Sequence, residues 1–107
     1  MAILAIDDDP NVCTLTKMYL KLEGLRTRMA TNRAEIVVAF RQAPLPDLVL
    51  LDVGLPDVNA FDVLAKLRQH PVLKNVPVIM VTASATRELS IRISRSEWRR
   101  TVILEAR

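Results

Sequence analysis

Two groups of acidic side chains, each placed directly after a short apolar run, are the residues of this chain best suited to chemistry. The runs cover residues 2–6 and 48–51, and the acidic residues that follow them are Asp7, Asp8, Asp9 and Asp52. Carboxylates held close together repel, so each is driven toward its protonated form unless a cation neutralises the group. A hard, oxygen-seeking cation is expected, and Mg²⁺ is the usual choice where a phosphoryl group is also bound.

The apolar runs predict how these carboxylates are positioned. Each run is only four or five residues long, too short for a helix and typical of a strand buried on both faces of a parallel sheet. Carboxylates just beyond two such strands meet at the carboxyl edge of the sheet, where open α/β sheets bind their ligands. We therefore expect a site at that edge.

The residues after the first acidic group predict a helix. Asp9 is a good N-cap, Pro10 is favoured at the first helical position, and Gly24 can end the helix in a left-handed conformation. Between these limits apolar side chains recur at helical spacing, namely Val12, Leu15, Tyr19 and Leu22.

The next segments alternate between strand and helix patterns. Residues 25–30 alternate apolar and polar, as in an edge strand. Two further helices are expected, one capped by Thr31 or Asn32 with the stripe Ile36, Val37 and Phe40, and one over residues 60–69 with Phe61, Leu64 and Leu67 inward. Residues 78–81 form another buried strand, which brings Thr82 to the edge that carries the aspartates. Four strands alternating with three helices predict right-handed βαβ units and a doubly wound parallel sheet of the α/β class.

The last twenty residues are ambiguous. Thr86 could cap a helix running to about Trp98, yet Leu89, Ile91 and Ile93 alternate with polar residues as in a strand. A parallel strand at residues 101–104 needs a crossover before it, which favours the helix. We expect a helix followed by a strand, with a hairpin as the alternative.

Length and composition limit the class of protein. The chain has 107 residues, of which 50% are hydrophobic and 25% charged, so we expect one small globular domain over residues 1–107. The first apolar run ends in aspartates, so we expect no signal peptide and no membrane span, and a cytoplasmic location. Cys13 is the single cysteine, which excludes an internal disulfide, and it is interpreted as buried filler, while His70 is interpreted as a surface residue at a helix end.

The net charge of +3 comes entirely from the basic tail at residues 87–107, which holds six arginines against three glutamates. Neither an aromatic platform nor a base-reading helix motif accompanies these arginines, which argues against a nucleic-acid partner.

Three motifs in order identify a resemblance. They are Ile3-Leu4-Ala5-Ile6-Asp7-Asp8-Asp9-Pro10, Leu48-Val49-Leu50-Leu51-Asp52-Val53-Gly54-Leu55-Pro56-Asp57 and Val78-Ile79-Met80-Val81-Thr82-Ala83. Together they resemble the receiver (CheY-like) domain of two-component response regulators, over residues 1–86. The resemblance implies a flavodoxin-like parallel sheet of strand order 2-1-3-4-5 and a signalling domain rather than an enzyme.

The resemblance also implies roles for particular residues. A sensor histidine kinase or a phosphotransfer protein would pass a phosphoryl group to Asp52. Mg²⁺ would be bound by Asp8, Asp52 and the backbone carbonyl of Gly54, with Asp7 acting through bound water. The hydroxyl of Thr82 would bond a phosphoryl oxygen.

The chain departs from the family at its end. Receivers carry a lysine after the fifth strand, and the matching residue here is Glu105, while Val102 stands where an aromatic residue is usual. A last helix is expected to be absent, which would leave apolar sheet uncovered and favour a homodimer through the C-terminal region. Two functions follow: a receiver that accepts phosphate on Asp52 with Mg²⁺, or a degenerate receiver that serves as a phosphorylation-independent interaction module.

Overall fold

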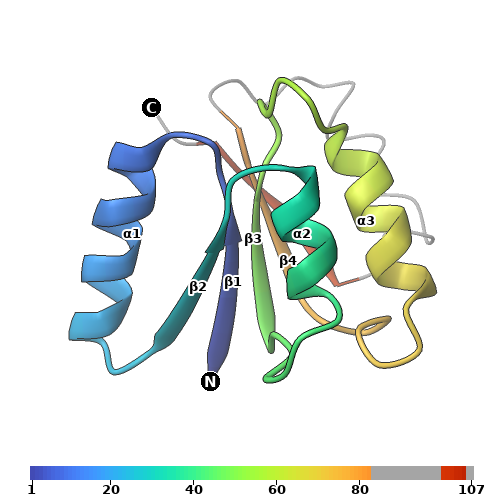
Figure 1. Ribbon diagram of the computed structural model, residues 1–107, viewed down its shortest axis with the longest axis horizontal. Coiled ribbons are helices and arrows are strands. Elements are labelled where there is room, and N and C mark those ends of the chain that lie inside the picture. The colour runs from blue at the N-terminus through green and yellow to red at the C-terminus, as the bar shows by residue number, and fades with distance from the viewer. Residues whose placement is uncertain (83–99, 106–107) are drawn as a thin grey trace.

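The computed structural model describes residues 1–82 and 100–105. Their strands form one parallel five-stranded sheet in the order β2-β1-β3-β4-β5, which confirms the predicted fold class and strand order (Figure 1). The strands are β1 (Ala2–Ile6), β2 (Arg26–Ala30), β3 (Leu48–Asp52), β4 (Val78–Thr82) and β5 (Thr101–Glu105). The helices of the described residues are α1 (Pro10–Leu22), α2 (Arg33–Ala39) and α3 (Ala60–Gln69).

Strand β5 settles part of the ambiguity at the end of the chain. It pairs in parallel with β4, in a register that runs from Val78 opposite Thr101 to Thr82 opposite Glu105. The predicted strand is therefore confirmed, whereas the choice between helix and hairpin depends on residues 86–98, which lie outside the described residues. The helix expected from Thr86 to about Trp98 lies outside the described residues, as does Ala83.

Side-chain caps start all three helices of the described residues. Asp9 Oδ1 accepts the N–H of Asn11 at 2.9 Å, as predicted, and Asn59 caps α3. Of the two candidates for α2, Asn32 is the cap, because its Oδ1 accepts the N–H of Glu35 at 2.9 Å. The Glu35 carboxylate in turn accepts both the N–H and the hydroxyl of Thr31, at 2.7 and 2.6 Å. These bonds satisfy N–H groups that have no partner within a helix.

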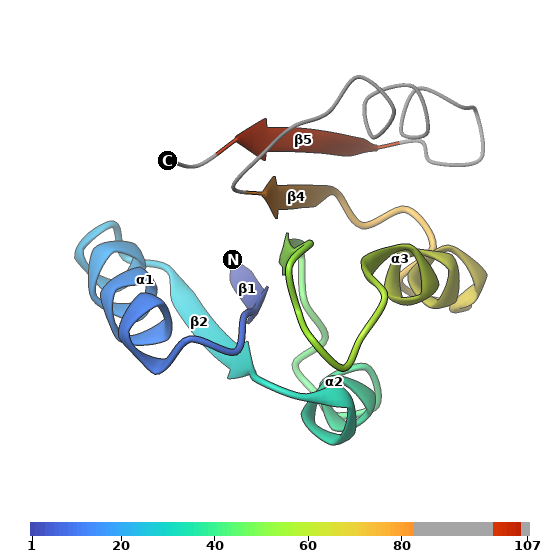
Figure 2. The same cartoon turned by 90° about the horizontal axis from the view of Figure 1, so that it is seen from above.

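One face of the sheet is covered by α2 and α3 (Figure 2). Six strand residues that point to this face are fully buried: Leu4, Ile6, Val49, Leu51, Val78 and Met80. From the helices, Ile36 and Phe40 of the α2 segment and Phe61, Leu64 and Leu67 of α3 join them, as the helical spacing predicts. These residues form the main hydrophobic core.

The opposite face carries α1, where the predicted helix is confirmed but its apolar stripe does not face the sheet. Cys13 is the buried residue of α1, whereas Val12, Leu15, Tyr19 and Leu22 are 42 to 81% exposed. The residues turned toward the sheet are Cys13 and, half-buried, Thr16 and Leu20. The spacing identifies a helix correctly, but α1 is the one helix that the described residues place on this face, and no second helix among them packs against the flank that carries the stripe. No helix among the described residues is both long and apolar enough to cross a membrane.

Candidate functional site

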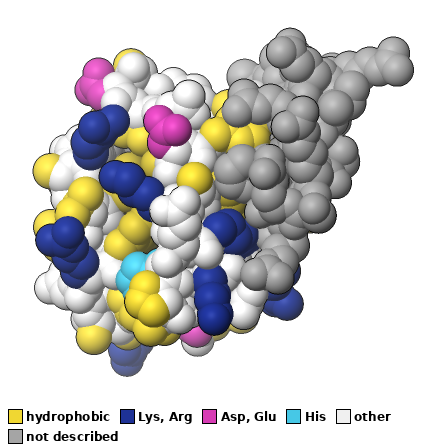
Figure 3. Space-filling model, turned by 90° about the vertical axis from the view of Figure 1, so that its right-hand side faces the viewer, with side chains coloured by type: hydrophobic (Ala, Val, Ile, Leu, Met, Phe, Trp, Pro, Cys, Tyr) yellow, Lys and Arg dark blue, Asp and Glu magenta, His cyan; other side chains and the backbone are white. Residues whose placement is uncertain are grey.

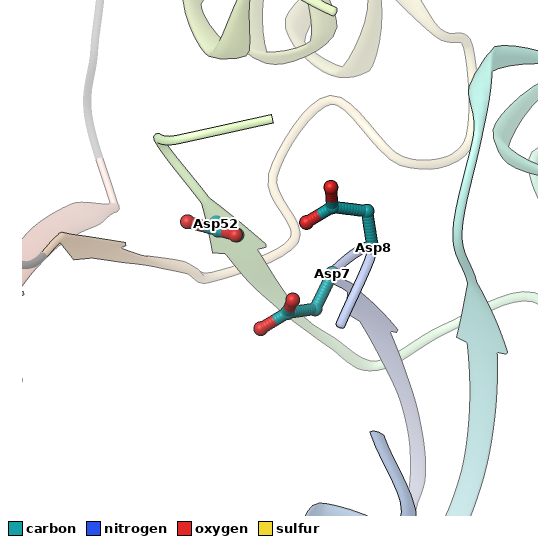
Figure 4. Close-up of side chains that lie close together, drawn as sticks. All are labelled: Asp7, Asp8 and Asp52. Carbon is teal, nitrogen blue, oxygen red and sulfur yellow. The ribbon is translucent and has the colours of Figure 1, made fainter. Parts of the chain in front are cut away.

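The acidic residues meet at the carboxyl edge of the sheet. Asp7 and Asp8 follow β1 and Asp52 ends β3, and these strands pair in parallel with Ile6 opposite Leu51. Each of the three side chains offers a carboxylate oxygen, and the three oxygens lie within 4.8 Å of one another (Figure 4). The sequence therefore predicted this juxtaposition correctly.

Short-range hydrogen bonds hold two of these carboxylates in place. Asp7 Oδ1 accepts the N–H of Asp9 at 2.9 Å, and Asp52 Oδ1 accepts the N–H of Gly54 at 2.9 Å. Each bond spans two residues, so it fixes the side chain against the start of the loop that follows its strand. Asp9 is not part of the cluster, because its side chain caps α1.

Cys13 has a positioning contact that the sequence analysis missed. Its buried thiol donates to the backbone carbonyl of Asp7 at 3.3 Å and so links α1 to the first acidic residue. Burial raises the pKa of this thiol, and the carboxylates of Asp7, Asp9 and Asp8 raise it further. The thiol is therefore kept protonated, which agrees with a packing role and not with a reactive one. The sequence offered one signal for this contact: Cys13 lies one turn into a helix that begins directly after the acidic residues.

The electrostatics of the cluster favour a bound cation. Partial burial raises the pKa of Asp7, and the neighbouring charges of Asp52, Asp8 and Asp9 add to this rise, against the opposing bond from the Asp9 N–H. A divalent ion among these oxygens would remove the repulsion. Mg²⁺ binds oxygens at about 2.1 Å in octahedral geometry, so its ligands lie about 3 to 4 Å apart. Oxygens within 4.8 Å of one another fit this ion with small side-chain movements.

The other predicted residues lie beside the cluster. Gly54 is two residues past Asp52, and a Cβ added to it would stand 3.4 Å from Asp52 Oδ1, an ordinary contact. Asp52 pairs with Val81, so Thr82 is one residue beyond it at the end of β4. Thr82 pairs with Glu105, which places position 105 at the same edge, where the resemblance expects a lysine. The structure thus gathers the predicted residues at one edge, and their roles remain predictions.

A small cavity of about 100 Å³ lies between α1 and the sheet next to the carboxylates. Asp7 and Asp52 line one part of it, and Val12, Leu50 and Val81 contribute apolar walls. The acidic site is therefore continuous with the less covered face of the sheet.

Basic side chains are dispersed on the side of the molecule that Figure 3 shows, with hydrophobic and uncharged side chains between them. Of the tail arginines, Arg100 alone belongs to the described part of the chain, and it is exposed. The described surface therefore offers no specific argument for a nucleic-acid interface.

A doubly wound parallel sheet with three carboxylates gathered at its carboxyl edge defines an α/β domain with an acidic site at that edge. The chain belongs to the response regulator receiver domain family, whose family model matches residues 3–102. The family is a signalling family of two-component systems, and the predicted resemblance is confirmed.

Curated relatives agree with this assignment. The DNA-binding response regulator MtrA of Mycolicibacterium smegmatis is 38% identical over 81 residues, which cover 76% of this chain and 34% of MtrA. An uncharacterized 14.6 kDa protein of Leptolyngbya boryana is 33% identical over 88 residues, which cover 82% of this chain and 66% of that protein. The chain thus spans about two thirds of one relative and one third of the other.

Solved structures show the same fold. The N-terminal domain of a response regulator receiver protein from Methanoculleus marisnigri superposes with a TM-score of 0.81 at 28% identity, covering 98% of this chain and 84% of that one. The TrrA response regulator of Thermotoga maritima, solved in complex with Mg²⁺ and BeF, gives a TM-score of 0.76 at 28% identity, covering 98% of this chain and 86% of that one.

Proposed function

We propose that this domain accepts a phosphoryl group on Asp52 from a sensor histidine kinase or a phosphotransfer protein, with Mg²⁺ as the cofactor. The observation that carries the proposal is the group of three carboxylate oxygens, from Asp7, Asp8 and Asp52, within 4.8 Å at the carboxyl edge. Family membership supports it, and so does the related receiver from Thermotoga maritima, which was solved with Mg²⁺ and BeF.

Asp52 is the nucleophile of the proposed transfer. One of its carboxylate oxygens attacks the phosphorus of a phosphohistidine, forming an O–P bond while the P–N bond breaks and the imidazole leaves as a neutral ring after taking up a proton. The hydrogen bond from the Gly54 N–H to Oδ1 orients the carboxylate, leaving Oδ2 without this restraint. Thr82, at the end of the neighbouring strand, would donate its hydroxyl to a phosphoryl oxygen.

Asp7, Asp8, Asp52 and the carbonyl of Gly54 are the groups that would hold Mg²⁺. The ion supplies charge neutralisation between an anionic nucleophile and an anionic phosphoryl group when it is bound. The chain's own residues supply position: the parallel pairing of β1 with β3 brings the acids together, and the thiol of Cys13 and the N–H of Asp9 hold Asp7 in place.

Intact-protein mass spectrometry tests this function. The chain is incubated with acetyl phosphate or phosphoramidate and Mg²⁺, and we expect a gain of one phosphoryl group that EDTA prevents. Asp52→Asn should abolish the gain, whereas Asp57→Asn, an exposed carboxylate five residues away, should leave it unchanged. If no donor gives an adduct, the phosphorylation-independent interaction module becomes the better description of this chain.

Glu105 provides a second test of the same site. Position 105 pairs with Thr82, and this chain has a glutamate there where the family resemblance expects a lysine. A lysine at this position would attract a phosphoryl group that a glutamate repels, so Glu105→Lys should raise the phosphorylated fraction at a fixed donor concentration by about tenfold. Glu23→Lys, the same charge change at an exposed site after α1, is the matched control and should have no effect.

A further inference from the structure

Strand β2 lies at one edge of the sheet, and alternate residues of this strand turn their backbone groups away from β1. The N–H of Arg26 and the carbonyl of Ala30 bond to the residues that flank β1, at 3.4 and 3.1 Å. Because the backbone groups of successive strand residues point in opposite directions, those of Thr27 and Met29 point outward. No other described strand pairs with β2, so its outer edge offers hydrogen-bonding groups to a further strand.

A groove of about 480 Å³ lies between α1 and this edge, and we name it the basic groove (Figure 1). The described residues that line it are Lys17, Met18, Lys21, Leu25, Arg26 and Thr27. Three of them are cations and none is acidic. Lys17 and Lys21 stand about one helical turn apart, where like charges repel and weaken a helix. An anion bound in the groove would remove this repulsion, and Met18 and Leu25 provide apolar surface for the group that carries the anion.

A second hollow, of about 230 Å³, lies on the other face of β2, and we name it the apolar pocket. The described residues that line it are Ala2, Ile3 and Leu4 of β1, Arg26, Thr27 and Arg28 of β2, and Ala39, Pro44 and Pro46 from α2 and the loop after it. The guanidinium of Arg28 donates to the carbonyls of Gln42 and Ala43 at 3.3 and 3.5 Å, which holds it against that loop. The small side chains of Ala2 and Ala39 leave room here for an aliphatic side chain from a ligand.

Thr27 lines both hollows, and its hydroxyl oxygen is buried without a hydrogen-bond partner. Buried polar groups are nearly always paired, because an unpaired group has lost its bonds to water and gained none in return. A carboxylate or a peptide carbonyl of a ligand at this edge could accept the hydroxyl proton. The unpaired hydroxyl therefore supports a ligand that carries oxygen acceptors.

An extended peptide fits this edge better than a compact anion does. Its main chain would bond to the outward N–H and C=O groups of Thr27 and Met29, as in proteins that bind a peptide as an added strand. Its side chains would point alternately to the two faces of the sheet, one set toward the basic groove and the other toward the apolar pocket. Acidic side chains suit the basic groove, and aliphatic side chains suit the apolar pocket.

We propose that the outer edge of β2 binds an extended segment of a partner protein in which acidic and apolar side chains alternate. The charges at the edge set this preference, because they repel strands of like charge and attract strands of opposite charge. A second copy of β2 carries Arg26 and Arg28 as well and is therefore repelled. The basic groove reaches Lys21 in the last turn of α1, whereas the acidic site lies at the start of that helix, so the two sites are separate. The proposal does not rest on phosphoryl transfer.

Binding of a fluorescein-labelled synthetic peptide of alternating glutamate and valine to the full 107-residue chain tests the proposal. Fluorescence anisotropy should show saturable binding. A peptide of alternating glutamate and serine has the same charge but no side chain for the apolar pocket, so it should bind about tenfold more weakly. Equal affinities would show that the chain attracts any polyanion, nucleic acid included, and would overturn the proposal. The absence of binding by both peptides would overturn it as well.

Charge reversal in the basic groove tests where the peptide binds. Lys17→Glu and Lys21→Glu together should raise the dissociation constant of the glutamate–valine peptide by about tenfold or more, because they replace attraction by repulsion. Lys66→Glu and Lys74→Glu together are the matched control, since these exposed lysines belong to α3 and the loop after it and give the same change in net charge. Equal weakening by the two pairs contradicts the proposed location. Circular dichroism checks that both variants are folded.

N-methylation of the peptide tests the added strand without any change to the chain. In an extended segment the N–H groups of alternate residues point toward β2, and the others point away. Methylation of all the glutamates and methylation of all the valines should therefore have unequal effects, with dissociation constants that differ by about tenfold or more. Equal affinities of the two methylated peptides would mean that no strand is added beside β2, and would overturn the proposal.

Discussion

The two faces of the sheet are built from similar residues but are packed to very different extents. On the α2–α3 face, the strand residues Val49, Leu51 and Met80 are completely buried against two helices. On the α1 face, one helix with a single buried residue, Cys13, covers a sheet of the same width. The difference lies in the number of helices that the described residues place on each face, because apolar side chains are available on both.

The two faces of the sheet therefore contribute differently to the stability of the domain. The face covered by α2 and α3, which we call the closed face, supplies most of the stability of the domain, since burial of apolar area is the main favourable term in folding. On the α1 face several large apolar side chains, among them Leu15 and Tyr19, remain in contact with water and add little to the stability of the fold. The acidic site lies at the carboxyl edge of the sheet, at the ends of β1 and β3.

Truncation of one leucine on each face should give the largest difference. Leu64 is fully buried in α3, so Leu64→Ala should lower the free energy of unfolding by about 2 to 5 kcal/mol, through lost burial and the cavity left behind. Leu15 is 53% exposed, so Leu15→Ala should change it by about 0.5 kcal/mol or less. Urea denaturation at low protein concentration, where association is negligible, measures both.

Equal losses of unfolding free energy for Leu64→Ala and Leu15→Ala would contradict the difference between the two faces, because they would mean that the apolar stripe of α1 is buried in the monomer. Leu67→Ala is a second variant for the closed face, since Leu67 is also fully buried, and it should match Leu64→Ala.

A histidine joins the two helices of the closed face and should give an intermediate effect. His70 Nδ1 accepts the N–H groups of Val72 and Leu73 at 3.0 and 3.1 Å, which leaves the ring proton on Nε2 to be donated to the carbonyl of Phe40 at 3.1 Å. His70→Ala removes three hydrogen bonds and should cost about 1 to 3 kcal/mol of unfolding free energy. Thermal or urea denaturation is the measurement.

Asparagine is the informative control at this position. The Oδ1 of Asn can replace Nδ1 as an acceptor but cannot reach Phe40, so His70→Asn should recover part of the loss. If His70→Ala is neutral, the contact between the ends of α2 and α3 is not important for closing this face. The sequence interpretation of His70 as a surface residue located it correctly at the helix end, where it is the C-cap of α3, but missed these bonds.

Much of the fold could be predicted because the local signals are strong. Short apolar runs followed by acids, and cap residues such as Asp9 before Pro10, identify strands and helix starts whatever surrounds them. The burial of the α1 stripe could not be predicted in the same way. Helical spacing shows which apolar residues share a side of α1, but whether that side is covered depends on how many helices the face carries.

The candidate site likewise has features that the sequence predicts and features that it does not. Parallel strands end at one edge, so the meeting of Asp7, Asp8 and Asp52 follows from sequence order and strand length. Two features could not be predicted: the hydrogen bond from the Cys13 thiol to the Asp7 carbonyl and the unequal burial of the carboxylates. Both depend on the position of α1 above the sheet, which no local pattern specifies.

Removal of the Asp7 charge should have a small effect on stability, and the sign of this effect should change with Mg²⁺. The pKa of Asp7 is raised in the folded chain above its ordinary value of 3.8, so ionisation of this group opposes folding once the pH rises through the folded pKa. Asp7→Asn should therefore stabilise the metal-free chain at neutral pH by up to about 1 kcal/mol, a gain that disappears as the pH falls below 3.8, where the wild-type group is protonated in both states. Asparagine can keep the hydrogen bond from the Asp9 N–H, so the substitution removes only the charge.

With Mg²⁺ the order of stability should reverse and the wild type should be the more stable, because the ion stabilises the wild type through all three carboxylates and the variant through two. Urea denaturation at neutral and acidic pH, with Mg²⁺ or EDTA, gives these comparisons, and a destabilised Asp7→Asn in EDTA at neutral pH would mean that the cluster does not repel itself without a cation.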